Sequence, residues 1–381
     1  MKRVEVKPEL LRWALTRSAK STRMLEKKFP KLEAWLAGEP SPTLKQLEKF
    51  AKATHTPIGY LFLPEPPAEP VPIPDFRTVA GTEIERPSPD LLDTIYLCQR
   101  RQDWYRDFAR AEGEEPLPFV GTARSGDDVT ASAARIRQQL GFDLEARRKM
   151  PTWTGALRQF VVQADALGVL VMVSGVVGSN TRRKLDPQEF RGFALADDLA
   201  PLVFVNGADT KTAQMFTLAH ELAHIWLGES ALSDAEARTV PSQQVERWCN
   251  RVAAELLVPL ASFRDAYDRQ AELSVELNRL ARRFKVSTLV ILRRMFDAGG
   301  LQGEAYQAAY ERELEHLRRL PKGSGGNFYL TLGARVSKRF ARALVVSTLE
   351  GRTLFRDAYS MLGIKKESTF RLLSEKLGYG F

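Results

Sequence analysis

A proline-rich stretch near the N-terminus sets the first limit on how this chain folds. The stretch PEPPAEPVPIP covers residues 64–74 and holds six prolines in eleven residues. Proline fixes φ and lacks the backbone N–H, so neither a helix nor a central strand tolerates such a run. The run therefore predicts a stiff, extended connector. We expect residues 1–63 to form one domain, followed by a linker over 64–87.

Residues 1–63 predict a set of short helices. Apolar residues at helical spacing place helices near 10–15, 22–28 and 31–37. Thr43, with Gln46 three residues later, forms a capping box that starts a fourth helix. Thr56-Pro57 starts a fifth, because proline suits the first helical position.

The end of this segment resembles a DNA-binding family. WLAGEPSPTLKQLEKFAKATHTPIGYLFLPEPP is similar to the end of a lambda-repressor-like (Xre-type) helix-turn-helix domain. In that family the third helix lies in the major groove. The sequence departs from the family in KKFPKLEAWLAGE, where Pro30 stands at the expected start of a shortened third helix. Two interpretations stay open: a domain that reads bases, or a helical domain that docks a partner or its neighbour. No DNA-binding residue is assigned.

Charge is concentrated at the two ends of the chain. The formal charge is +9; residues 1–60 carry +7 and residues 321–381 carry +7, which leaves −5 for 61–320. Basic surfaces suit phosphate backbones. DNA contact through the N- and C-terminal domains is therefore one expectation, and an ordinary solvated surface is the other.

Several classes of protein are not expected from this sequence. It contains no apolar run of about 18 residues and no charged-then-apolar leader, so we expect a cytoplasmic protein without a membrane partner. Cys98 and Cys249 are the two cysteines, too few for a disulfide framework or a multi-cysteine zinc module. Any metal must be held by His, Asp or Glu.

The rest of the chain predicts a mostly helical α+β fold. Residues 88–150 form a helical connector, and residues 151–320 a domain in which GVLVMVSG, RGFALAD and PLVFVNG have the composition of short strands. Further helices fill 234–300. The break PKGSGGN precedes a basic helical C-terminal domain over 321–381.

A histidine pair in the apolar stretch MFTLAHELAHIWLGES (215–230) is the strongest functional signal. His220 and His224 lie four residues apart, on one face of a helix, and Glu221 is offset by about 100°. This HExxH spacing is typical of zinc-dependent peptidases. The alternative is a histidine pair satisfied within a core. The apolar flanks argue against it, because unpaired imidazoles are costly to bury.

A second helix supplies a candidate third ligand. VERWCNRVAAELLVP (245–259) places Glu246 and Asn250 four residues apart beside an apolar stripe. Glu246 can bring one carboxylate to the ion. Two His and one Glu leave a fourth position open, as a catalytic zinc requires.

Taken together, these segments resemble the ImmA/IrrE (DUF955) family of metallopeptidases. The resemblance rests on FTLAHELAH, on the Glu246 helix and on LNRLARRFKVSTLVILRRM at 277–295. It implies a zincin-like peptidase domain, with Zn²⁺ (Mn²⁺ is the alternative) held by His220, His224 and Glu246, and with Glu221 as general base. Asn250 is the candidate partner that holds a ligand in place.

The resemblance carries two further expectations. The strand PLVFVN (201–206) is the candidate sheet edge that pairs with an extended substrate. Cys249 stands where the family usually has Ala, and we expect it to pack as a small buried residue rather than to bind the ion.

We therefore expect a regulatory zinc endopeptidase that acts on a protein, such as a helix-turn-helix repressor or a toxin-type partner. The resemblance places such proteins in stress responses, mobile elements or toxin–antitoxin pairs. The alternative is a DNA-binding or antitoxin-like regulator whose peptidase-like domain mainly binds a partner protein. The sequence also leaves room for a homodimer.

Overall fold

The structure is a computed structural model. It describes the chain except for residues 1–2, 19–21, 77–86, 234–242, 320–332 and 381. The described part divides into two compact units, residues 1–72 with 82–95, and residues 73–81 with 96–381. The domain boundaries expected from the sequence stay predictions, and the predicted Gly/Ser break at 321–327 lies outside the described residues.

The first unit contains the four short α-helices expected from the sequence, and a 3₁₀ helix with Pro57 as its N-cap stands in place of the expected fifth helix. Its elements are α1 (Pro8–Arg17), α2 (Thr22–Lys28), α3 (Leu32–Ala37), α4 (Leu44–Thr54) and the 3₁₀ helix η1 (Ile58–Phe62). The predicted capping box is present, since the Thr43 side chain accepts from the Gln46 backbone N–H and the Gln46 side chain accepts from that of Thr43. Leu32 and Trp35 of α3 are buried in the core of this unit. Two residues of the short helix α3 are therefore buried in the core and are not available at the surface.

The proline-rich connector does not leave this unit at once. The Arg17 guanidinium at the end of α1 pairs with the Glu69 carboxylate, with Nη2 2.8 Å from Oε1. Lys7 Nζ donates to the Pro64 carbonyl. These contacts hold the first part of the connector against the helices from which it leaves.

The second unit is built around a four-stranded sheet. Its strands are β1 (Leu170–Ser174), β2 (Gly192–Leu195), β3 (Leu202–Asn206) and β4 (Ala231–Ser233), in the order β1-β3-β2-β4. β1 and β3 are parallel, and β2 is antiparallel to both β3 and β4. The predicted edge at 201–206 is therefore wrong: β3 lies inside the sheet, and β4, which the sequence did not reveal, forms the edge next to β2.

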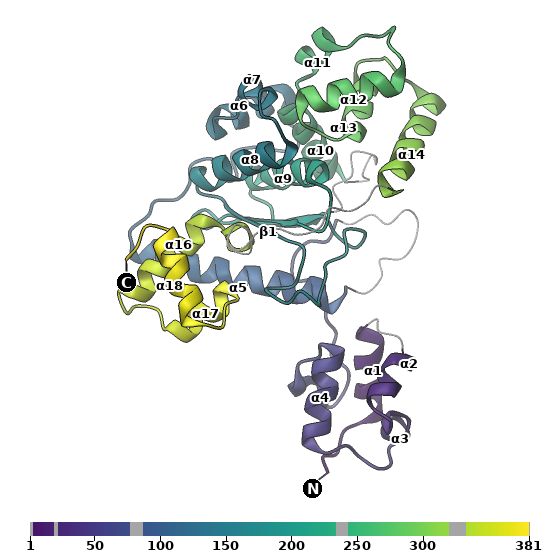
Figure 1. Ribbon diagram of the computed structural model, residues 1–381, viewed down its shortest axis with the longest axis vertical. Helices are drawn as coiled ribbons and strands as arrows, with labels where there is room; N and C mark the ends of the chain where they lie inside the picture. The colour runs from purple at the N-terminus through teal and green to yellow at the C-terminus, as the bar shows by residue number, and fades with distance from the viewer. Residues whose placement is uncertain (1–2, 19–21, 77–86, 234–242, 320–332, 381) are drawn as a thin grey trace. The chain divides into compact units, whose positions relative to one another are not determined.

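Helices cover both faces of this sheet (Figure 1). α8 (Trp153–Leu167) and α9 (Lys211–Leu227) pack on one face, and α6 (Val129–Leu140) and α10 (Gln244–Leu257) add a second layer over α9. The C-terminal part of α5 (Pro89–Ala111) follows the other face, where Gln102 donates to the carbonyls of Leu195 and Ala200.

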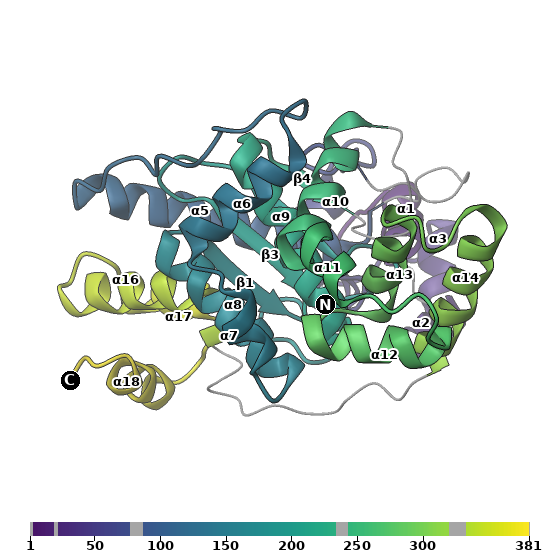
Figure 2. The ribbon, with the colours of Figure 1, turned by 90° about the horizontal axis from the view of Figure 1, so that it is seen from above.

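Two helical groups complete the second unit, and most of the first group lies at the end opposite the second (Figure 2). One group comprises α7 (Leu144–Arg148), α11 (Leu260–Ala266), α12 (Leu273–Phe284), α13 (Thr288–Asp297) and α14 (Gly303–Arg319). The other comprises α16 (Lys338–Leu349), α17 (Phe355–Leu362) and α18 (Glu367–Lys376). The second group is tied to α8, because the Arg339 backbone N–H donates to Asp165. A mostly helical α+β fold is thus confirmed.

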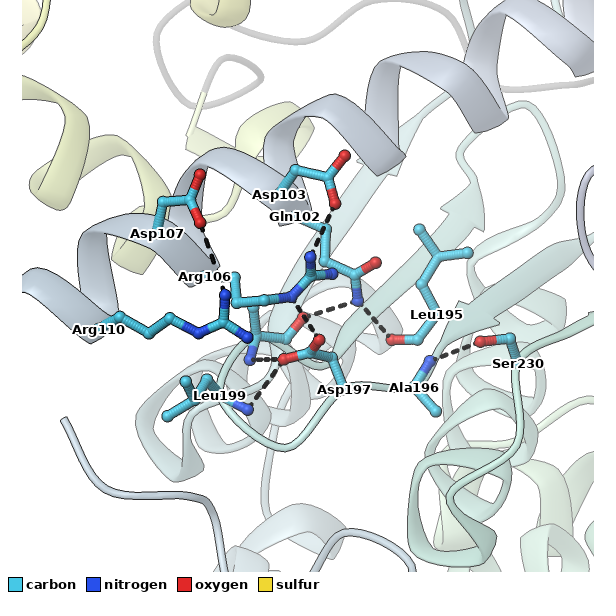
Figure 3. Close-up of polar contacts among 11 residues, drawn as sticks. Gln102, Asp103, Arg106, Asp107, Arg110, Leu195, Ala196, Asp197, Leu199 and Ser230 are labelled. Carbon is cyan, nitrogen blue, oxygen red and sulfur yellow. Dashed lines mark hydrogen bonds and ion pairs between the residues drawn. The ribbon is translucent and has the colours of Figure 1, made fainter.

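A polar network fixes the turn between β2 and β3 (Figure 3). Arg106 of α5 pairs with Asp197, with Nε 2.6 Å from Oδ2, while the other Asp197 oxygen accepts from the backbone N–H groups of Leu199 and Ala200. The Ala196 N–H donates to the Ser230 hydroxyl, 2.9 Å away. The start of β4 is therefore anchored to the end of β2.

Candidate metal centre

The helix α9 is defined at both ends by capping residues. The Thr210 side chain accepts from the Ala213 N–H at its start, and Gly228, in the left-handed region with φ 72°, ends it. Proline-free, apolar sequence between these caps gives a helix whose residues 214–226 are all buried. Buried on every side, α9 holds any polar side chain it carries in one position.

The structure brings the two histidines together with Glu246. His220 Nε2 lies 3.1 Å from His224 Nε2. Glu246, from α10, places Oε2 3.3 Å from His220 Nε2 and Oε1 2.9 Å from His224 Nε2. All three side chains are buried, and one ligand atom from each lies within 4.8 Å of the others. Three residues from two helices thus point their donor atoms at one place.

These distances fit a metal ion held by this donor set. In a tetrahedral zinc site with bonds of about 2.0–2.1 Å, ligand atoms lie about 3.3 Å apart. Two imidazole nitrogens and one carboxylate oxygen are ligands that Zn²⁺ accepts, and they leave a fourth position open. The site therefore fits the ion that the sequence predicts, while the identity of the ion stays a prediction.

Asn250 contacts the first of the two histidines. Its Oδ1 lies 3.0 Å from His220 Nδ1, one turn of α10 beyond Glu246. An amide oxygen only accepts, so Nδ1 carries the hydrogen and Nε2 keeps its lone pair facing the cluster. Asn250 thus contacts a predicted ligand, and its role in holding that ligand stays a prediction. His224 Nδ1 has no hydrogen-bond partner among the described residues.

Charge within the cluster follows from burial and from the Glu246 carboxylate. Burial acts to raise the pKa of Glu246, but His220 and His224 together bring it far below its usual range. Burial acts to lower the pKa of His220, and Glu246 more than offsets this, so the net shift is upward. Burial lowers the pKa of His224. Glu246 is therefore the anionic member that a cation requires.

Glu221 is placed beside the cluster without belonging to it. It is fully buried, and neither carboxylate oxygen has a close hydrogen-bond partner among the described residues, although the Ser233 hydroxyl is near enough to act on its pKa. Burial raises the pKa of Glu221 to about 8. Buried carboxylates are normally paired, so a carboxylate without a close partner is unusual, and its role as general base stays a prediction.

Cys249 does not belong to the donor group found in the described residues. It is a free, fully buried thiol, and burial raises its pKa well above the usual value. This position is consistent with the expected packing role.

Two neighbours of the site were not identified from the sequence. Phe76 lies within the predicted linker, yet its ring stacks on His224 with centroids 6.2 Å apart and 21° between the planes. Gly192, at the start of β2, lies against Glu221. The only sequence signal for Gly192 was the presence of a glycine at the first position of a strand. In the structure, this glycine allows the close approach of α9.

Part of the chain is similar to known proteins. Residues 164–296 match the family model described as IrrE N-terminal-like domain, and residues 336–376 match one described as a domain of unknown function (DUF8813). The chain is 29% identical over 191 residues to the "Radiation response metalloprotease IrrE" of Deinococcus radiodurans, which covers 47% of this chain and 51% of that protein. It thus spans about half the length of this curated relative.

The ImmA/IrrE resemblance is therefore confirmed, and its matched range includes all the predicted site residues. The resemblance of residues 1–63 to a helix-turn-helix domain stays a prediction, as do the roles of the individual side chains. Among the described residues, no helix is long and apolar enough to cross a membrane. The expected cytoplasmic location stays a prediction.

Proposed function

We propose that this chain is a regulatory metallo-endopeptidase that cleaves a protein substrate. One observation carries the proposal: His220, His224 and Glu246 converge from two helices, while Glu221 lies beside them without a close hydrogen-bond partner. A chain that only binds a partner has no need of both a complete ligand set and a separate buried carboxylate.

The roles follow from the positions. His220, His224 and Glu246 would hold the ion, and Asn250 fixes the His220 ring. A bound divalent cation supplies Lewis acidity, which polarises a peptide carbonyl and makes water a better nucleophile. Glu221 accepts the proton of the attacking water and returns it to the leaving amine. Burial raises the pKa of Glu221 and the charge of a bound ion lowers it, and the two opposing effects suit a carboxylate that accepts and then returns a proton.

The substrate class is inferred from the resemblance and the relative. We propose a protein such as a helix-turn-helix repressor, or a toxin-type partner, in a stress response, mobile element or toxin–antitoxin pair. The name of the relative, which includes "radiation response", favours the stress setting. Zn²⁺ is the proposed ion, with Mn²⁺ as the alternative. A homodimer stays compatible with this proposal.

A DNA-binding regulator is the second candidate, favoured by the charge of +7 at each end. α3 has six residues and buries Leu32 and Trp35, while the exposed side chains on and before it include Glu33 and Lys31. Such a helix offers few donors to base edges. We therefore propose that any DNA contact is made to phosphates, in which case binding falls steeply with salt and varies little with sequence.

Metal analysis together with a Glu221→Gln variant tests the enzyme. The purified full chain should contain about one divalent ion per protein, and the variant should keep the ion. N-terminal labelling of proteins exposed to either form should show new termini with the wild type alone. A chain that binds no stoichiometric ion, or a variant that produces the same termini, would sink the proposal. Glu229→Gln, an exposed residue just beyond α9, is the matched control.

A further inference from the structure

The end of the connector lies beside the metal centre. Residues 73–76, here called the strap, lie along the outer edge of β4. The Leu232 N–H donates to the Pro74 carbonyl and the Phe76 N–H donates to the Leu232 carbonyl, each at 2.9 Å. Asp75 is the parallel bridge partner of Leu232. The strap thus pairs with the outer edge of β4 through one isolated parallel bridge.

The strap uses the outward-facing hydrogen-bonding groups at the middle of β4. In a strand, the N–H and C=O of one residue face the same edge, and those of its neighbours face the other. Leu232 is the middle residue of β4, and both of its groups go to the strap. An extended peptide pairing at this position would need the same two groups.

The strap also covers one predicted ligand. Phe76 is half-buried and its ring lies over the His224 imidazole, with centroids 6.2 Å apart and planes 21° from parallel. Aromatic rings at this separation attract each other beyond the effect of the area that they bury. The strap therefore combines main-chain pairing with one side-chain contact at the metal centre.

This edge is held independently of the strap. Ser230, just before β4, accepts from Ala196, and β4 pairs with β2 through Ala231, Leu232 and Ser233 (Figure 3). A fixed sheet edge binds extended peptides through main-chain hydrogen bonds, while side-chain contacts give specificity.

We propose that the outer edge of β4 is the docking edge for an extended substrate segment with an aromatic residue facing His224, and that the strap is its resident occupant. The inference rests on the proposed function, since it concerns how substrate reaches that site. Because the strap is part of the same chain as the edge, its effective concentration there is higher than that of a free peptide at assay concentrations. A substrate segment must displace it, so release of the strap controls access.

Peptide binding in the Glu221→Gln background tests the proposal without requiring catalysis. The probe is a labelled synthetic peptide of residues 70–76 (PVPIPDF), added to the full chain with Zn²⁺. One variant replaces residues 73–76 with Gly-Ser-Gly-Ser. The matched control makes the same replacement at 65–68, which spares Lys7–Pro64 and Arg17–Glu69. Fluorescence anisotropy gives the Kd, and hydrogen–deuterium exchange reports on the Leu232 amide.

The strap variant should bind the peptide at least about tenfold more tightly than the unaltered strap or the control. Its Leu232 amide should exchange faster, and added peptide should slow it again. A peptide with Ala in place of the Phe should bind more weakly. Unchanged affinity, or Leu232 exchange equal to that with the unaltered strap, would overturn the proposal.

Two further measurements keep the outcome interpretable. If the Gly-Ser variant does not fold, Phe76→Ala carries the test, because it keeps the backbone pairing and loses the ring; it should bind the peptide severalfold more tightly than the unaltered strap. If the chain with Glu221 intact cleaves no protein, with or without the strap, while the peptide still competes with the strap, the proposed function fails and the docking edge stands. If the wild type cleaves its substrate and removal of the strap changes neither binding nor rate, the docking edge fails alone.

Discussion

Gly192 of β2 lies so close to Glu221 of α9 that a Cβ at position 192 would be 3.0 Å from Glu221 Oε1. The same Cβ would lie 2.6 Å from Thr217 Cγ2 and 2.8 Å from the Phe204 carbonyl oxygen. The missing side chain therefore lets α9 approach the sheet at the point where Glu221 is carried. The position of the proposed base depends on this glycine.

We predict that Gly192→Ala lowers the peptidase rate about 10- to 100-fold while the protein keeps its metal. The added methyl group must push α9 away from β2 or displace Glu221, and a shift approaching 1 Å in a catalytic group costs up to about 100-fold. Neither His220 nor His224 supplies one of the three atoms nearest to a Cβ at position 192. Metal content and rate should be measured on the same preparation.

The compensating and control variants make this prediction specific. Thr217→Ser removes the nearest atom and should restore part of the rate in the double variant. Gly126→Ala is the matched control, since a Cβ there meets nothing within 4 Å. A Gly192→Ala protein with the wild-type rate would show that Glu221 does not depend on this contact.

The site was predictable where its signals are local in sequence. His220 and His224, and likewise Glu246 and Asn250, are pairs at i and i+4, so one helical turn fixes each pair. That the two pairs meet was an expectation from amphipathic faces, and the structure places them together. Helix and strand positions followed in the same way, from periodicity and caps.

The features missed depend on contacts between distant segments. Strand order cannot be read from strand composition, which is why 201–206 was expected at an edge and lies inside the sheet. β4 has three residues, too few for an alternating pattern. Phe76 meets His224 only because the connector returns to β4. None of these contacts produces a periodic pattern in the sequence.

We predict that Asn250→Ala weakens metal binding about 10- to 100-fold. The variant loses the acceptor that holds His220 Nδ1–H, and partners of this kind typically contribute that much to metal affinity. Asn250→Asp keeps an acceptor and should keep most of the affinity. Competition with a chromogenic chelator measures the Kd.

Asn278→Ala is the control for this series, because Asn278 is an exposed residue on α12 that donates to the Ser274 carbonyl. Equal affinities for Asn250→Ala and the wild type would mean that the contact with His220 does not orient the ligand.

Neither cysteine should react in the folded protein. Cys98 and Cys249 are buried, and burial raises the pKa of Cys98 to about 12 and that of Cys249 well above its usual value. The thiolate is the reactive form. Iodoacetamide at pH 8 should therefore modify no cysteine before unfolding and two afterwards, as read by intact-protein mass spectrometry.

Metal analysis of a Cys249→Ala variant separates a packing role for Cys249 from a ligand role. Cys249→Ala should keep one ion per protein and lose about 1 kcal/mol of stability through the lost packing. His224→Ala should lose the ion. Loss of metal in Cys249→Ala would instead make the thiol a ligand.

The metal-free protein should lose stability with rising pH because of Glu221. Its pKa is about 8 in the folded protein, against an ordinary value of 4.5, because burial disfavours the charged form. Between these values the folded state holds a proton that the unfolded state has released. The free energy of unfolding therefore falls as pH rises through this window, by up to about 1.4 kcal/mol per pH unit.

Glu221→Gln removes this contribution, because the amide is neutral at every pH and has nearly the same shape. We predict the outcome of urea unfolding at pH 5, 6, 7 and 8 with a chelator present. The free energy of unfolding of the variant should rise relative to that of the wild type by a few kcal/mol from pH 5 to pH 8. Glu229→Gln, exposed, should follow the wild type. Restoring Zn²⁺ should reduce the gap, since a nearby cation favours the ionised carboxylate. If the free energies of unfolding of Glu221→Gln and wild type change with pH in parallel in the chelated protein, Glu221 is ionised without the ion. In that case burial does not raise the pKa of Glu221.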